Sequence, residues 1–485
     1  MKALINKIKK DKYFKYVIGV FLIGTFLRFY RLNAFITFLG DQGRDAIVIK
    51  RILFFEHFPA IGAPTSIGQV YLGPFYYYFI APWLLLFNLN PLGLAFGVAL
   101  ISSVFILINY LLIKELFNEK IAFMSTVFLA FSKTIIEFSR FSWNPNLLPY
   151  FSFLLYYFFV KSLRDKKYMW SFLSGMFLSF SLQLHYLALF FIPSIILLYC
   201  LELIRKKGEI VKILKNAGVL FISFIFFSVP LFIFDFRHNF LNLNNFIALS
   251  KTSSNISENV FILFFKTFPV FNQYVFNVKL NAILLYAILT ILIFTLIYLF
   301  KKNWKLTCVL IFFLLTYFCL SLFGGPKYPH YFLELYIFYF ILLSYFLYDI
   351  NNIKFGKIII FIFLISFIFT NMQDYYIFKN IGSFQLEKAK KISRIIFNNI
   401  DKTRYSITSL PMNYSDTTYR YFLEIWNKKP IDKESFEKGQ ELFVICEDKC
   451  DPLNSPQWDI AYFGGNKIEE TWKSNNVKIY KLIKE

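Results

Sequence analysis

Three charged residues in the segment Gly40-Asp41-Gln42-Gly43-Arg44-Asp45 have the types and spacing for acid–base chemistry on an anionic substrate. If a helix begins near Gly43 with Asp41 as its N-cap, Asp45 lies in the first turn and Arg44 points to a neighbouring face. A carboxylate can deprotonate an acceptor hydroxyl, and a guanidinium can hold a phosphate. The structural alternative is that Asp41 caps an interfacial helix and Arg44 pairs with it.

Other polar residues occur at the ends of apolar segments, where they could contribute to a substrate site. Asn144, between Trp143 and Pro145, could hydrogen-bond a sugar, although Asn-Pro is also common in turns. Each cation taken alone is better explained as a structural or snorkelling side chain, but together they would form an anion site. The candidate substrate-binding residues are Arg44, Arg140, Asn144, His185, Arg237, His238, Lys327 and His330.

Long apolar segments must position these residues. Hydrophobic residues make up 57% of the 485 and aromatic residues 22%. Several runs approach or reach the roughly 20 apolar residues that cross a bilayer. The chain is therefore predicted to be an α-helical polytopic membrane protein with about eleven spans and additional interfacial helices. The spans are expected near 16–29, 93–113, 121–138, 147–162, 169–187, 189–204, 212–234, 281–300, 305–322, 331–349 and 357–371.

The distribution of basic residues predicts which face each loop occupies. Lysines precede the first apolar run, which has no small-residue cleavage site, so an uncleaved anchor with a cytoplasmic N-terminus is expected. The segment 75–89 would put later basic loops on the wrong side if it crossed the membrane, so it is predicted to be re-entrant or interfacial. All candidate site residues then lie on the external face. The basic residues that this prediction places on the cytoplasmic side are Lys2, Lys7, Lys9, Lys10, Lys12, Lys15, Lys114, Lys120, Lys161, Arg164, Lys166, Lys167, Arg205, Lys206, Lys207, Lys301, Lys302 and Lys305.

The net charge of +22 does not indicate nucleic-acid binding. Lys and Arg occur in short clusters between apolar runs rather than in a basic domain, and the positive-inside rule accounts for them. The expected location is the plasma membrane, with membrane lipid rather than nucleic acid as a partner.

Residues 372–485 have a more polar composition and are predicted to form a small external α/β domain, following a transmembrane domain over 1–371 whose first external loop is 33–92. Cys446 and Cys450 could form a disulfide or remain two thiols, while a zinc site lacks further nearby ligands. No GxGxxG, Walker or Ser-elbow motif occurs in the sequence, so nucleotide hydrolysis and soluble-hydrolase chemistry are not indicated.

The layout resembles the GT-C glycosyltransferases, which include protein O-mannosyltransferases and the bacterial aminoarabinose and RgtA/B/C/D-like transferases. This resemblance implies transfer of a sugar from a polyprenyl-phosphate carrier, on the external side, to a lipid, glycan or protein hydroxyl. The segments that carry it are Gly40-Asp41-Gln42-Gly43-Arg44-Asp45-Ala46, Leu72-Gly73-Pro74-Phe75-Tyr76-Tyr77-Tyr78, Ala81-Pro82, Ser142-Trp143-Asn144-Pro145-Asn146 and His185-Tyr186.

The resemblance also implies roles for the first-loop residues. Asp41 would be the general base or orient the acceptor, Asp45 would support it, and Arg44 would bind the donor phosphate. Some members use a divalent metal (Mg or Mn) and others do not, so Asp41 and Asp45 are also candidate metal ligands. The motif here is Asp-Gln-Gly-Arg-Asp, whereas the better-known mannosyltransferase members carry an adjacent Asp-Glu pair, which leaves the metal and mannose specificity open.

Two other classes of function remain as alternatives. A transporter or flippase for a lipid-linked oligosaccharide would place ionisable residues deep within spans and show repeated halves, whereas Glu202, Asp235 and Glu334 lie near predicted span ends. An O-antigen-type polymerase or ligase would place its key Arg and His in a large later loop. The segment 235–280 is long enough for that reading.

Overall fold

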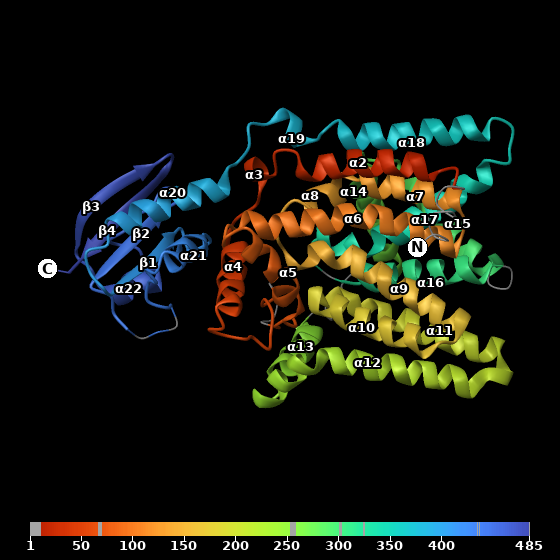
Figure 1. Ribbon diagram of the computed structural model, residues 1–485, viewed down its shortest axis with the longest axis horizontal. Helices are drawn as coiled ribbons and strands as arrows, with labels where there is room; N and C mark the ends of the chain where they lie inside the picture. Colours follow the sequence, from red (N-terminus) through yellow and green to blue (C-terminus); the bar gives the residue numbers. More distant parts are fainter. Residues whose placement is uncertain are drawn as a thin grey trace.

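A computed structural model gives the fold of residues 11–484, except for 66–69, 253–258, 300–302, 324, 434 and 436. It confirms the predicted fold class. A bundle of apolar helices forms one domain, and a small α/β domain lies at one end of the bundle (Figure 1). We call that end of the bundle the domain-side end.

Every predicted span overlaps a helix, and one of them, 121–138, is divided between two helices. In the described part of the chain, five helices are long and apolar enough to cross a membrane, and others are shorter. The basic residues Lys2, Lys7, Lys9, Lys10, Lys301 and Lys302, used to predict sidedness, lie outside the described residues. The helices at the predicted spans are α2 (Phe14–Phe29), α6 (Leu92–Leu116), α7 (Glu119–Phe131), α9 (Leu148–Asp165), α10 (Tyr168–Leu184), α11 (Phe191–Arg205), α12 (Ile210–Arg237), α15 (Ala282–Leu299), α16 (Trp304–Ser321), α17 (Tyr336–Ile350) and α18 (Gly356–Met372).

Two parts of the helical domain differ from the prediction. The segment 121–138 is not one continuous helix, because α7 ends at Phe131 and α8 (Lys133–Phe138) begins after Ser132. The segment 235–280 is not a long loop, because it contains α13 (Leu241–Thr252) and α14 (Val260–Phe276). Lys266 and Pro269 interrupt the apolar pattern of α14, and so its sequence does not read as a span.

Short elements at the domain-side end hold the polar motifs. Helix α5 has 12 residues and is too short to cross a bilayer alone, as expected for a re-entrant or interfacial segment. Figure 1 shows α4 and α5 between the bundle and the α/β domain. These elements are α3 (Leu32–Phe35), α4 (Gly40–Leu53), α5 (Phe75–Leu86), η1 (Asn144–Leu147), η2 (Tyr186–Phe190), η4 (Pro329–Leu335) and α19 (Tyr376–Lys379).

The C-terminal domain is a four-stranded sheet with helices around it. Its strand order is β1-β2-β4-β3, with β1 and β2 parallel and the other neighbours antiparallel. Every residue of β2 is buried, which places the domain core at the centre of the sheet. The elements are α20 (Gln385–Asn398), β1 (Tyr405–Leu410), α21 (Thr417–Ile425), β2 (Glu441–Cys446), α22 (Trp458–Phe463), β3 (Lys467–Ser474) and β4 (Val477–Ile483).

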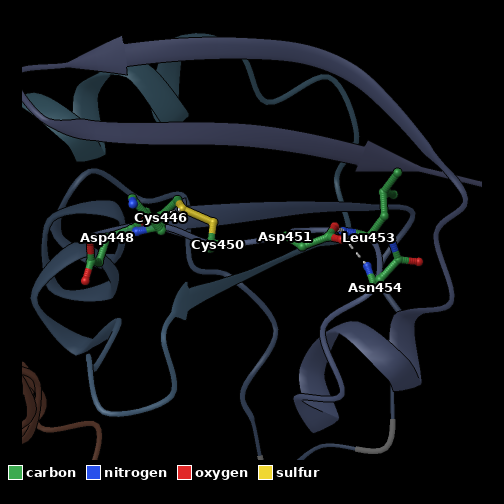
Figure 2. Close-up of a disulfide and its surroundings, with 7 residues drawn as sticks. Cys446, Asp448, Cys450, Asp451, Leu453 and Asn454 are labelled. Carbon is green, nitrogen blue, oxygen red and sulfur yellow. Dashed lines mark hydrogen bonds between the residues drawn. A yellow bond between two sulfur atoms is a disulfide. The ribbon is translucent and has the colours of Figure 1, made fainter.

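A disulfide joins the end of β2 to the turn that follows it. Cys446 and Cys450 are bonded, with their Cα atoms 6.0 Å apart (Figure 2). Beyond it, the Asn454 side chain donates a hydrogen bond to Asp451. Of the two states that the sequence left open for these cysteines, the structure therefore has the disulfide.

Candidate active site

Helix α4 carries the first-loop charges and starts earlier than predicted. It begins at Gly40 with Leu39 as its N-cap, and the Gln42 side chain accepts a hydrogen bond from the Leu39 N–H at 3.0 Å. Asp41 therefore lies in the first helical turn and is not the N-cap. Because residues four apart share a helix face, Asp41 and Asp45 lie on the same side of α4.

Arg44 binds both carboxylates. Its Nη1 donates to Asp41 Oδ1 at 2.9 Å, while its Nε and Nη2 donate to Asp45 Oδ1 at 3.0 and 2.8 Å. The Asp41 side chain is 51% exposed, whereas that of Asp45 is 1% exposed. The guanidinium is thus engaged by carboxylates, and Asp41 is the carboxylate that an incoming substrate can reach.

Asp45 is held from a second helix. The Tyr77 hydroxyl on α5 donates to Asp45 Oδ1 at 3.1 Å, whereas Asp45 Oδ2 is buried without a hydrogen-bond partner among the described residues. Burial raises the pKa of Asp45 above its usual value, while the nearby Arg44 acts in the opposite direction. Asp45 is therefore placed to hold Arg44 and, through it, Asp41.

A second group of predicted residues lies at the domain-side ends of other helices. We call it the aromatic–histidine cluster: Trp143, His185, Tyr328, His330 and Tyr331. The ring of His330 lies 4.9 Å from Trp143, 6.2 Å from His185 and 4.3 Å from Tyr331, measured between centroids. Its stacking on Tyr328 completes the cluster.

His185 is a hydrogen-bond donor rather than a cation at neutral pH. Burial lowers the pKa of His185 to about 3, with a smaller effect from His330. Its Nδ1 accepts a hydrogen bond from the Leu187 N–H at 3.2 Å. The neutral ring must then carry its proton on Nε2, which can donate to a ligand oxygen.

Lys327 supplies a cation beside this cluster. Its Nζ donates to the carbonyl of Leu320, in the last turn of α16, at 2.9 Å and to that of Phe323, two residues after the helix ends. Burial lowers the pKa of Lys327 to about 8, so its charge changes close to physiological pH.

Two adjacent tyrosines of α5 connect the two groups. Tyr77 bonds Asp45, while the Tyr76 hydroxyl lies 2.6 Å from Ser142 Oγ. Ser142 directly precedes Trp143 of the aromatic–histidine cluster. The Tyr76-Tyr77-Tyr78 run, which belongs to the segment predicted to be re-entrant or interfacial, thus supplies side chains that join the two parts of the site.

Arg140 and Asn144 are engaged elsewhere. Arg140 is buried and donates to the carbonyls of Leu27, Arg28 and Tyr30 at 2.7–2.9 Å, which closes the C-terminal end of α2. Asn144 Nδ2 donates to the Leu184 carbonyl at 2.6 Å. In this arrangement both residues support the helix ends around the site.

Arg237 and His238 also lie apart from the two groups. Both are exposed at the end of α12, and His238 Nδ1 lies 2.8 Å from the carbonyl of Phe234, whose ring it stacks on. Within the described residues, no contact joins either of them to the carboxylates or to the aromatic–histidine cluster.

The residues around Asp41 and Asp45 do not fit a divalent metal. The Arg44 guanidinium bonds both carboxylates, so it stands where such a cation would bind and offsets one of their two negative charges. Among the residues that the structure describes, no group of three or more His, Cys, Asp or Glu side chains is arranged to hold a metal ion. The mechanism proposed below uses no metal.

The sequence did not predict that the C-terminal domain contacts α4. The Thr417 hydroxyl of α21 donates to the Gly40 carbonyl at 2.7 Å, and a Cβ on Gly43 would lie 2.5 Å from the Thr418 nitrogen. At the other end of α4, Arg51 makes two 3.1 Å bonds to Glu424 of α21. The pair of glycines in α4 is the sequence signal for this close approach, although it does not identify the partner.

A charged pair on α8 was also missed. Glu137 lies 4.0 Å from Lys133, and the ring of the next residue, Phe138, is 6.3 Å from His330. Both residues lie within the predicted span 121–138, and the only sequence feature that indicates a pair is their i,i+4 spacing.

The arrangement of helices and attached domain is a GT-C-like fold, as the sequence resemblance predicts. The family model for dolichyl-phosphate-mannose-protein mannosyltransferase matches residues 72–233. That range includes α5, the Ser142-Trp143-Asn144 segment and His185. No curated protein sequence matches the chain.

Solved structures give the same fold over most of the chain. ArnT from Cupriavidus metallidurans bound to undecaprenyl phosphate superimposes with a TM-score of 0.58 at 12% identity, over 97% of this chain and 98% of ArnT. The archaeal oligosaccharyltransferase AglB from Archaeoglobus fulgidus, in complex with an inhibitory peptide and a dolichol-phosphate, gives 0.56 at 12% identity, over 90% of this chain and 69% of AglB.

Proposed function

We propose that this protein is a membrane glycosyltransferase that moves a sugar from a polyprenyl-phosphate carrier to a hydroxyl of a lipid, glycan or protein acceptor. The observation that carries the proposal is the partly exposed Asp41, fixed by Arg44 on α4, at the domain-side end of a GT-C fold. Such a carboxylate can meet an acceptor hydroxyl without leaving its helix.

Asp41 acts as the general base in the proposed reaction. It takes the proton from the acceptor hydroxyl while that oxygen attacks the anomeric carbon of the donor sugar. The bond from this carbon to the phosphate oxygen breaks, and the polyprenyl phosphate leaves with the electron pair. Tyr77 holds Asp45, Asp45 holds Arg44, and Arg44 in turn fixes Asp41 in place.

The leaving phosphate requires a cation and hydrogen-bond donors. Lys327 supplies positive charge, and His185 Nε2–H and His330 lie beside it in the aromatic–histidine cluster. Preorganised donors lower the barrier because they are already in place when negative charge develops on the phosphate oxygen. No nucleotide-binding fold is needed, because the isoprenoid tail of the carrier partitions into the bilayer.

We assign the domain-side end to the external face of the plasma membrane and the N-terminus to the cytoplasm. The positive-inside distribution supports this topology. The Cys446–Cys450 disulfide also supports it, because disulfides persist mainly in oxidising compartments. The apolar helices agree with an integral membrane protein.

The transporter alternative is less favoured by the positions of the acidic residues. Glu202 lies in the last turn of α11 and pairs with Arg205 at 2.8 Å. Asp235 lies in the last turn of α12 and accepts a hydrogen bond from the Asn242 N–H at 2.6 Å. Glu334 lies in η4, before α17. None of the three lies in the middle of a helix, where a transport pathway would place it.

The test of function is sugar transfer in membranes that contain the protein. Membranes are supplied with a panel of polyprenyl-phosphate-linked sugars or, separately, with the corresponding nucleotide sugars, and new glycosylated products are identified by mass spectrometry. Transfer from a lipid-linked donor is expected. Transfer from nucleotide sugars alone, or from no donor, would contradict the proposal.

The pKa of Lys327 predicts how donor affinity changes with pH. With a pKa of about 8, Lys327 is roughly 90% protonated at pH 7 and about 10% protonated at pH 9, so the donor KM should rise up to about tenfold across this interval. Arginine remains charged throughout, so Lys327→Arg should flatten the rise. KM is measured at each pH in wild type, Lys327→Arg and the exposed control Lys390→Arg. An identical rise in all three would exclude Lys327 as the titrating group.

A further inference from the structure

The C-terminal domain has a small open pocket that the proposed transfer chemistry does not use. It lies between β1, α21 and α22. Trp458 on its wall is 64% exposed and stacks on Tyr462, with 5.1 Å between ring centroids and 19° between ring planes. The ammonium of Lys438 lies 4.8 Å from the Tyr462 centroid. A planar side chain with more than half of its surface exposed cannot have both faces covered, so Trp458 offers a ring face to a ligand.

Polar groups stand beside this aromatic surface. Lys433 Nζ lies 3.2 Å from Asp459 Oδ2 and 3.1 Å from Asp416 Oδ1. Thr408 also donates to Asp459 Oδ2, at 2.6 Å. The described bonds to Asp459 all end on Oδ2, which leaves Oδ1 as an acceptor for a ligand. Lys433 uses two of its three ammonium protons in the contacts with Asp416 and Asp459.

We propose that this pocket binds a sugar ring of a glycan. The C–H face of a pyranose can pack on the open face of Trp458, since an aromatic ring presents a large apolar surface. Adjacent sugar hydroxyls both donate and accept hydrogen bonds, which matches a carboxylate acceptor beside an ammonium donor. Three acidic residues balance three basic ones around the pocket, so a neutral ligand is favoured over a nucleic acid or an anionic headgroup. They are Asp432, Glu437 and Asp459, and Arg420, Lys433 and Lys438.

The pocket lies close to the helix that carries Asp41. Asp432 of its wall is 3.7 Å from Arg51 of α4. Asp416, which bonds Lys433, follows Ser415, and a Cβ on Gly40 would meet the Ser415 Cβ at 2.6 Å. The bound glycan is therefore the acceptor chain, a step that rests on the proposed glycosyltransferase function.

Binding is tested with the full-length protein in detergent micelles on a printed array of neutral pyranose oligosaccharides. The saccharide captured is then titrated against wild type, Trp458→Ala and Trp458→Phe. Trp458→Ala should bind at least about tenfold more weakly, and Trp458→Phe within about threefold of wild type, because phenylalanine keeps a ring face. Equal thermal unfolding midpoints verify that the exposed substitution does not unfold the domain.

Capture of no saccharide, or equal affinity of wild type and Trp458→Ala, would overturn the sugar site whether or not the protein transfers sugar. The acceptor role is tested separately by offering the captured saccharide to wild type with the donor that it uses. Its glycosylation supports the role. If wild type glycosylates other acceptors but never this saccharide, the acceptor role is overturned, while the proposed enzymatic function stands.

Discussion

Asp41→Asn is expected to lower sugar transfer by roughly 10²–10⁴-fold, the usual contribution of a general base. Asparagine has the same shape and retains an oxygen that can accept the hydrogen bond from Arg44 Nη1, so α4 should keep its geometry. What is lost is the ability to take a proton from the acceptor. Transfer is measured as an initial rate at saturating donor, together with donor KM, and KM should change little.

The control for this variant is Asp349→Asn. Asp349 is an exposed carboxylate near the far end of α17, away from the domain-side end. Its substitution removes one negative charge from the same protein and should leave transfer unchanged. If Asp41→Asn retains the wild-type rate in normally inserted protein, Asp41 is not the base and the proposed mechanism fails at its first step.

The spans were predictable because length and apolar composition are local properties. The apolar run 93–113, which lies within α6, reads as a span without reference to any other part of the chain. The break at Ser132 and helix α14 were not predictable in this way. In α14, Lys266 and Pro269 lower the apolar signal, and contacts with α15 and α16 help to hold the helix in place.

The same difference between local sequence properties and contacts with distant residues decides which parts of the candidate site could be predicted. Asp41, Arg44 and Asp45 were recognised as a unit because they are neighbours on one helix, and their mutual bonds follow from that spacing. Arg140 could be identified as a cation, but its partners Leu27, Arg28 and Tyr30 are more than 100 residues away in sequence. Sequence alone cannot show whether such a side chain faces a ligand or caps the C-terminal end of a helix that is distant in sequence.

The second large effect is expected from the contact between α4 and the C-terminal domain. Helix propensity alone predicts that Gly43→Ala stabilises α4 by about 0.5–1 kcal/mol. Packing predicts the opposite, because the new Cβ would lie 2.5 Å from the Thr418 nitrogen and 2.7 Å from the Thr417 carbonyl carbon, both backbone atoms of α21. Since backbone cannot rotate away as a side chain can, either α21 or the first turn of α4 must shift.

Such a shift should displace the Asp41 carboxylate and so lower the rate of transfer, because Asp41 lies half a turn from Gly43 on the same helix. A displacement of about 1 Å can cost around 10²-fold in rate, so Gly43→Ala should lower transfer at least about tenfold and lower the unfolding midpoint. Gly218→Ala is the matched control: its added Cβ in α12 meets nothing within 4 Å, so transfer should be unchanged. A fully active Gly43→Ala with a raised midpoint would mean that propensity outweighs packing there, and that docking of the C-terminal domain does not fix the position of Asp41.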